Sequence, residues 1–178
     1  ISGAVSDGHA YVQQVAEKGA AAVIVEKDVE APEGLTVIKV ENTRYALALT
    51  SAAYFGYPAE KLKVIGITGT KGKTTTTYLV KSILENAGYK VGLVGTIEVI
   101  IGDEHIHANN TTPESYLLQE YFARMVEAGL DTVVMEVSSQ ALMLHRTQGF
   151  VFDYGIFTNL EPDHIGPNEH ASFEEYLH

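Results

Sequence analysis

Residues 64–75 read VIGITGTKGKTT, which is a short apolar strand followed by a glycine-rich turn, a lysine and two threonines. A helical pattern starts directly after them. In this order of parts, the main-chain N–H groups of the turn converge on an anion, and the helix adds the positive end of its dipole. Lys73 supplies a point charge, and a threonine hydroxyl can reach Mg²⁺. The segment therefore predicts a phosphate-binding loop for ATP or a related nucleotide.

The loop departs from the common P-loop pattern in one place. That pattern has a glycine where Ile67 stands, whereas here Gly66 and Gly69 flank the position, so the loop is a shorter variant. The alternative interpretation is a strand-turn-helix corner whose glycines serve packing alone. Packing does not require Gly-Lys-Thr-Thr at the start of a helix, so the pattern favours nucleotide binding.

The composition is that of an ordinary globular protein. Of 178 residues, 46% are hydrophobic and 20% are charged, and no apolar run is long enough to span a membrane. The net charge of −11 argues against a nucleic-acid partner, because such proteins carry a surplus of Lys and Arg. The absence of cysteine excludes disulfides and thiolate metal sites. We expect a cytoplasmic protein whose partners are small molecules, with no insertion into a membrane.

Apolar runs and turn residues alternate along the chain with the spacing of strands and helices. Strands are predicted at 21–25, 36–40, 90–94, 97–101, 104–107, 131–137 and 154–158, and helices at 10–18, 42–55, 74–87 and 113–128. Asn42 is the expected cap of the second helix, Pro113 is expected in the first turn of the last, and residues 56–61 read as a linker. Strands that alternate with helices predict an α/β fold with a doubly wound sheet.

Three polar clusters follow predicted strands, at the sheet edge where ligands of doubly wound folds bind. One is the glycine-rich loop, the second begins at Glu136, and the third spans residues 159–164. Glu136 is a carboxylate within an apolar strand, so its burial needs a partner. It could hold Mg²⁺ beside Thr74, or instead cap the turn at Ser138 or pair with a lysine. The residues alone leave these alternatives open.

Other polar residues give weaker signals. Asp163 and His164, with His170 nearby, could bind a metal, but such a pair more often forms a hydrogen-bonded loop. Residues 110–113 read NTTP and could bind an anionic substrate group, although a helix N-cap is the default interpretation. Arg146 could bind a carboxylate or a phosphate, and an exposed arginine at a helix end would look the same.

Taken together, these motifs resemble the Mur ligase family. The matching segments are TGTKGKTT at 68–75, NTTP at 110–113, EVSSQAL at 136–142 with Arg146, and FTNL at 157–160 with Asp163 and His164. The resemblance runs over essentially the whole chain and is closest to the members that add the third amino acid to UDP-N-acetylmuramoyl-L-alanyl-D-glutamate. It implies an ATP-dependent amide ligase of peptidoglycan precursor synthesis that uses Mg²⁺ and forms an acyl phosphate.

The resemblance also implies roles for individual residues. The catalytic residues would be Lys73, Glu136 and His164, and the Mg²⁺ ligands would be Thr74, Glu136 and His164. The ATP phosphates would be bound by Gly69, Thr70, Lys71, Gly72, Lys73, Thr74 and Thr75. The muramoyl dipeptide would contact Asn110, Thr111, Thr112, Ser138 and Arg146, with Ala4, Val5 and Ser6 near the uracil nucleotide. Gln140 and Leu144 depart from residues that are common in the family, and both lie near the implied substrate contacts.

By the same resemblance, residues 1–62 would be part of a uridine-binding α/β domain, and residues 63–178 would be the front of a central ATP-binding domain. The family's third domain and its carbamylated lysine would lie beyond residue 178, and no lysine follows Lys90. We therefore expect this chain to bind nucleotide and to be catalytically incomplete. The alternatives are a related ligase of the folylpolyglutamate synthase or cyanophycin synthetase type, and a nucleotide-binding module without catalysis.

Overall fold

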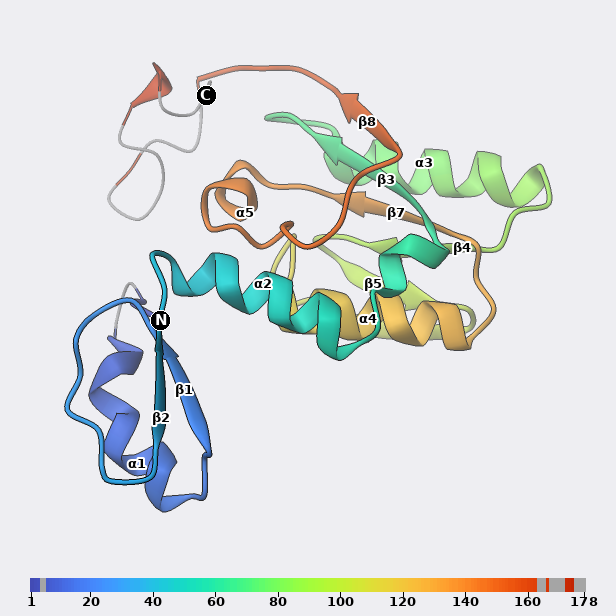
Figure 1. The fold of residues 1–178 in the computed structure, drawn as a ribbon. Helices are drawn as coiled ribbons and strands as arrows, with labels where there is room; N and C mark the ends of the chain where they lie inside the picture. Colours follow the sequence, from blue (N-terminus) through green and yellow to red (C-terminus); the bar gives the residue numbers. More distant parts are fainter. Residues whose placement is uncertain (4–5, 163–165, 167–171, 175–178) are drawn as a thin grey trace. The chain divides into compact units, whose positions relative to one another are not determined.

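The computed structural model describes residues 1–3, 6–162, 166 and 172–174 (Figure 1). The chain forms two compact units, an N-terminal unit of residues 1–47 and a C-terminal unit of residues 48–178. Within the described ranges, no helix is long and apolar enough to cross a membrane. The assignment of residues 1–62 and 63–178 to two domains of a Mur ligase stays a prediction.

The N-terminal unit is a small α/β arrangement around two parallel strands. Its elements are the 3₁₀ helix η1 (Gly8–Tyr11), α1 (Val12–Glu17), β1 (Ala22–Val25), β2 (Thr36–Lys39) and the start of α2 (Thr43–Tyr54). Gly19 has a φ of +91°, a conformation that suits glycine and ends the first helix. Asn42 caps α2 as predicted, because its Oδ1 accepts the N–H groups of Arg44 and Tyr45, each at 2.9 Å.

The C-terminal unit is built on one six-stranded sheet. Its elements are η2 (Pro58–Lys61), β3 (Lys63–Thr68), α3 (Lys73–Asn86), β4 (Val91–Val94), β5 (Glu98–Ile101), β6 (Glu104–His107), α4 (Ser115–Glu127), β7 (Thr132–Glu136), α5 (Ser139–Met143) and β8 (Tyr154–Phe157). The strand order is β6-β5-β4-β7-β3-β8, in which the last four strands are parallel and β5 and β6 are antiparallel. The α/β fold is therefore confirmed.

Helices cover both faces of this sheet, as a doubly wound fold requires (Figure 1). On one face, α4 packs Leu118 and Phe122 against Val64 and Met135. On the other face, Val80 and Leu84 of α3 pack against a cluster that includes Val134. Successive residues of a strand point to opposite faces, so Val134 and Met135 face different helices. Glu136 shares the face of Val134 because it is two residues farther along the same strand. The fold thus turns this carboxylate toward the helix that follows the glycine-rich loop.

Three local predictions are wrong. The last predicted helix begins at Ser115 with Glu114 as its N-cap, so Pro113 lies outside its first turn and residues 110–112 do not cap it. The supposed linker at 56–61 contains buried residues, and Ala59 belongs to the main core cluster. The third concerns the apolar run at 154–158, a pattern that predicts a parallel strand covered on both faces. In β8, Tyr154 and Phe157 are instead 64% and 63% exposed.

Candidate active site

The glycine-rich loop connects β3 to α3 in a conformation that two glycines make possible. Gly69 and Gly72 have φ values of +130° and +84°. A Cβ on Gly69 would lie 2.2 Å from Thr158 Oγ1 and 2.8 Å from the carbonyl oxygen of Asn159, so only glycine fits against the segment that follows β8. The contact at Gly69 is a packing requirement, which the alternative interpretation expected of these glycines, whereas a Cβ on Gly72 would meet nothing within 4 Å.

Asn159 accepts hydrogen bonds from two main-chain N–H groups of the loop. The N–H of Thr70 donates to its carbonyl oxygen at 3.0 Å, and the N–H of Lys71 donates to its Oδ1 at 2.9 Å. The N–H groups of the first turn of α3 have no helical acceptors, and groups of this kind can bind an anion. Lys71 itself forms an ion pair with Glu161 through an exposed ammonium group.

Lys73 lies over the loop that precedes it. Its Nζ donates to the carbonyl oxygens of Gly69, at 2.6 Å, and of Thr70, at 3.1 Å. These acceptors are neutral, so the positive charge of the ammonium is not cancelled by them. A phosphate that approaches the start of α3 would meet this charge together with the helix dipole.

Glu136 is the central residue of the site. Its side chain is buried, with 1% of the residue exposed, and three neutral groups donate to its carboxylate. Oε2 accepts from Thr74 Oγ1 at 2.9 Å and from Thr96 Oγ1 at 3.1 Å, while Oε1 accepts the N–H of Thr96 at 2.9 Å. A Cβ on Gly95 would lie only 2.6 Å from Oε1. The partners of this carboxylate are thus hydroxyls and an N–H, neither a lysine nor the turn at Ser138.

The Thr74 and Glu136 pair fits the chemistry of Mg²⁺. Thr74 donates its one hydroxyl proton to the carboxylate, so its oxygen lone pairs stay available beside the carboxylate oxygens. Mg²⁺ prefers oxygen ligands and usually keeps water and substrate phosphate in its shell, so few protein ligands suffice. Among the described residues, no group of three or more His, Cys, Asp or Glu side chains could hold a metal. His164 and Asp163 lie outside the described residues.

A second cluster of polar residues contacts the main-chain carbonyl oxygen of Glu136. Thr112 is buried, and its Oγ1 donates to the carbonyl oxygen of Glu136 at 2.9 Å and accepts the N–H of Ser138 at 3.1 Å. Ser138 Oγ accepts the N–H of Ala141 and so caps α5. The turn at 110–112 is therefore fixed to the end of β7, and this contact, rather than a helix cap, is what Thr112 supplies.

Arg146 is not an exposed arginine at a helix end, which was the alternative interpretation of this residue. Its side chain is 11% exposed and forms an ion pair with Glu114, at 2.7 Å between Nη2 and Oε1. Its Nη1 donates to the carbonyl oxygen of Thr112 at 3.2 Å. Its buried Nε has no acceptor among the described residues. The structure thus brings Arg146, Thr112 and Ser138 together with Glu136, while Asn110 is exposed on the same turn.

Thr96 is a residue of this site that sequence reasoning missed. Besides its two bonds to Glu136, its Oγ1 lies 3.0 Å from Thr111 Oγ1. A signal for it was present, because Gly95 and Thr96 directly follow β4 at the same carboxyl edge as the loop and Glu136. Asn159 was part of a recognised polar cluster, but no pattern indicated that it would hold the loop.

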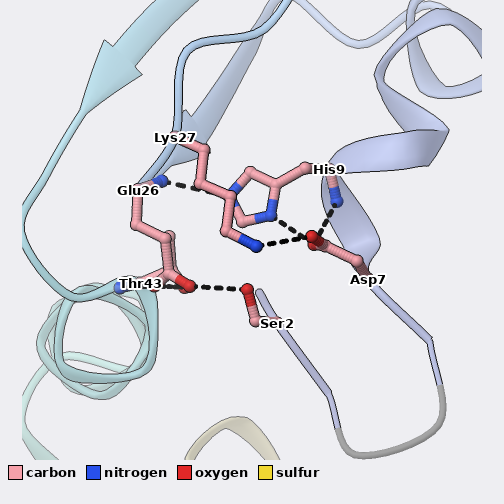
Figure 2. Close-up of polar contacts among 6 residues, drawn as sticks. All are labelled: Ser2, Asp7, His9, Glu26, Lys27 and Thr43. Carbon is pink, nitrogen blue, oxygen red and sulfur yellow. Dashed lines mark hydrogen bonds and ion pairs between the residues drawn. The ribbon is translucent and has the colours of Figure 1, made fainter.

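The N-terminal unit has a polar cluster of its own, formed by Ser2, Asp7, His9, Glu26, Lys27 and Thr43 (Figure 2). Asp7 contacts both His9 Nδ1, at 2.5 Å, and Lys27 Nζ, at 2.7 Å. His9 Nε2 accepts the N–H of Glu26 at 3.1 Å, which leaves Nδ1 as the nitrogen that faces Asp7. The hydrogen bond from Lys27, followed by those from His9, holds the pKa of Asp7 well below its usual range.

Glu26 joins three segments of that cluster. Its Oε2 accepts the hydroxyl and the N–H of Thr43, at 2.6 and 3.0 Å, and its Oε1 accepts the hydroxyl of Ser2 at 2.8 Å. The bonds from Thr43, then that from Ser2, lower the pKa of Glu26 to about 2. Of the implied nucleotide contacts in this unit, Ser6 is exposed, and Ala4 and Val5 lie outside the described residues.

Comparisons with known proteins identify the family of the chain. Residues 67–178 match the family described as "Mur ligase middle domain". The UDP-N-acetylmuramoyl-L-alanyl-D-glutamate--2,6-diaminopimelate ligase of Clostridium perfringens (strain 13 / Type A) is 51% identical over 176 residues, which are 99% of this chain and 36% of that protein. The protein of the same name from Bacillus licheniformis is 48% identical over 178 residues, which are 100% of this chain and 36% of that protein.

A solved structure of a protein with that name superposes with a TM-score of 0.78 at 23% identity. The match covers 94% of this chain and 33% of that one, and it supports the fold. The chain therefore spans about a third of the length of the relatives it matches.

Proposed function

Because this chain belongs to the Mur ligase family, we propose that the natural protein containing it is an ATP-dependent amide ligase. Its acceptor would be UDP-N-acetylmuramoyl-L-alanyl-D-glutamate. The amino acid added would be 2,6-diaminopimelate, because relatives about half identical to this chain are named for that substrate. Lysine is the amino acid to test against it.

One observation carries this proposal: Glu136 joins two functional clusters. Its side chain accepts from Thr74 at the start of α3, and its carbonyl oxygen accepts from Thr112 of the 110–112 turn. A ligase of this type must hold a triphosphate against a substrate carboxylate, and both are anions. A single buried residue between the nucleotide loop and a polar turn is suited to that task.

In the proposed reaction, the substrate carboxylate attacks the γ-phosphoryl group of ATP, giving an acyl phosphate and ADP. The amine of the incoming amino acid then displaces phosphate and forms the amide. Lys73 and the N–H groups that begin α3 would neutralise charge on the phosphates. Thr74 and Glu136 would hold Mg²⁺, which supplies further charge neutralisation when bound. Thr111, Thr112, Ser138 and Arg146 would orient the muramoyl dipeptide.

The test is amide formation by the natural protein that contains this chain. The protein is incubated with Mg·ATP, the UDP-muramoyl dipeptide and either diaminopimelate or lysine, and product is identified by mass spectrometry. We expect product with diaminopimelate, and a loss of at least about 100-fold in Lys73→Ala, because charged hydrogen bonds contribute about 1.5–3 kcal/mol each. Lys39→Ala, which removes an exposed ammonium paired with Asp28, should act like wild type.

The other outcomes separate the alternatives. Nucleotide binding without ADP formation would favour a binding module. ADP formation only with a folate or a polymeric acceptor would favour the related ligases. Absence of any Mg·ATP binding would overturn the proposal altogether.

A further inference from the structure

Thr96 occupies the tip of the β4–β5 hairpin, between the two clusters that meet at Glu136. The hairpin closes with the N–H of Gly95 donating to the carbonyl oxygen of Glu98 at 3.1 Å, so Thr96 and Ile97 form its turn. Although Thr96 is exposed overall, its N–H and hydroxyl both reach the buried carboxylate. Its hydroxyl also reaches Thr111, in the turn that leads to Thr112.

The hydroxyl of Thr96 has one proton and two neighbours, which fixes the direction of the hydrogen bonds. A carboxylate is a stronger acceptor than a hydroxyl, so Thr96 donates to Glu136 and accepts from Thr111. This gives a chain of donors from Thr111 to Thr96 to Glu136. With the N–H of Thr96 on one oxygen and its hydroxyl on the other, the carboxylate cannot rotate without breaking a bond.

The hairpin turn is tied to the same helix that carries Thr74. Tyr78 lies one turn along α3 from Thr74, and its hydroxyl donates to Glu98 Oε1 at 2.7 Å. His105 Nδ1 contacts the other oxygen of Glu98 at 2.7 Å. Burial, followed by the bond to Glu98, raises the pKa of Tyr78 to about 12, so this hydroxyl remains a donor at physiological pH. One helix thus contacts Glu136 through Thr74 and the hairpin through Tyr78.

We propose that Thr96 is a positioning residue of the active site, which aims the Glu136 carboxylate at the nucleotide loop and links it to the substrate turn through Thr111. The Tyr78–Glu98 contact holds the hairpin, and therefore Thr96, in register with α3. This inference rests on the proposed function. It assigns to Thr96 a role that acts through the Glu136 carboxylate.

The test compares Thr96→Val with Thr96→Ser in the natural protein that contains this chain. Valine keeps the shape and the N–H but removes the hydroxyl, whereas serine keeps both donors. We measure the Mg²⁺ concentration that half-saturates ATP binding, and the KM for the UDP-muramoyl dipeptide. Thr96→Val should raise both by about fivefold, the equivalent of one hydrogen bond, and Thr96→Ser should stay within about twofold of wild type.

Each possible result either supports or contradicts the positioning role proposed for Thr96. An unchanged Mg²⁺ requirement and KM in Thr96→Val, with wild type binding Mg·ATP, would overturn this inference alone. Failure of wild type to bind Mg·ATP would instead overturn the proposed function. If Thr96→Val does not fold, Tyr78→Phe decides, because it removes only the hydroxyl that holds Glu98. It should raise the Mg²⁺ requirement about fivefold, the equivalent of the lost hydrogen bond, and no change there would contradict the role of Thr96.

Discussion

Glu26 in the N-terminal unit and Glu136 in the C-terminal unit have nearly the same local chemistry. Each carboxylate accepts three hydrogen bonds, two from hydroxyls and one from a main-chain N–H. Both join segments that are distant in the sequence. Their surroundings differ: Glu136 lies at the carboxyl end of a central parallel strand and contacts Thr74 at the start of α3, whereas Glu26 follows a two-stranded sheet and caps the start of α2.

The difference teaches that the hydrogen bonds of a carboxylate do not by themselves reveal a site. What distinguishes Glu136 is convergence: the loop after β3, the turn after β4 and the 110–112 turn bring three threonines and the N-terminus of α3 to the end of β7. Glu26 has donors enough to satisfy its charge, and its neighbours in Figure 2 are held by one another. We therefore propose that Glu26 stabilises the fold and that Glu136 binds ligand, and three experiments test this division.

The largest effect is expected from the carboxylates themselves. Glu136→Gln keeps the shape but removes the charge that would face Mg²⁺, so we expect Mg·ATP affinity to fall by about 1,000-fold, or about 4 kcal/mol. Glu26→Gln should leave that affinity within about twofold. Isothermal calorimetry on the natural protein containing this chain measures both. Equal losses in the two variants would contradict the division.

The glycines of the two regions should give the next largest effect. In Gly69→Ala the new methyl group meets the Asn159 carbonyl oxygen at 2.8 Å, and in Gly8→Ala it meets the Ile1 carbonyl oxygen at 2.9 Å. Each should cost about 2–3 kcal/mol of local stability, measured by hydrogen exchange in the affected segment. Only Gly69→Ala should also weaken nucleotide binding.

Gly102→Ala is the control that measures the cost of the left-handed backbone conformation without a steric clash. Gly102 has a φ of +59°, and a Cβ there meets nothing within 4 Å. Its substitution should cost about 1 kcal/mol, from the left-handed conformation alone. A cost for Gly69→Ala no greater than this would show that the loop can move away from the segment after β8.

The sequence predicted most of the fold because its signals were local. Periodic apolar residues and turn glycines located nearly every helix and strand, and Asn42 was correctly expected to cap α2. The error at Pro113 has a physical cause: Thr112 is needed in a long-range contact with β7, which delays the start of α4 until Ser115. Residues 56–61 contain helix- and turn-forming residues whose burial depends on α4, and no local pattern reveals that.

The candidate site was predictable where a residue type conflicted with its surroundings. Glu136 stood out because a charge within an apolar strand needs a partner. Thr96 did not, because a threonine after a strand is ordinary until the topology places β4 beside β7. Glu26, Asp7 and His9 gave no sign of their network, since each has a partner on another segment: Ser2 for Glu26, Lys27 for Asp7 and Glu26 for His9.

The smallest effect concerns the pH dependence of the Glu26 cluster. Glu26 has a pKa of about 2 in the folded chain, against an ordinary value of 4.5, because Thr43 and Ser2 donate to its ionised form. A lowered folded pKa stabilises the fold above the unfolded pKa, and this contribution is lost as pH falls from about 5 to about 2. Solvent screening limits the loss to about 1 kcal/mol.

An NMR titration of the Glu26 carboxyl carbon measures this directly. Its midpoint should lie near 2 in the folded chain. Thr43→Val removes the strongest donor and should raise the midpoint, while the N–H at position 43 still donates. Glu26→Gln should remove the corresponding part of the stability change between pH 5 and 2. A wild-type midpoint at the ordinary value would mean that this carboxylate does not hold its three segments together, and the stabilising role assigned to Glu26 would be wrong.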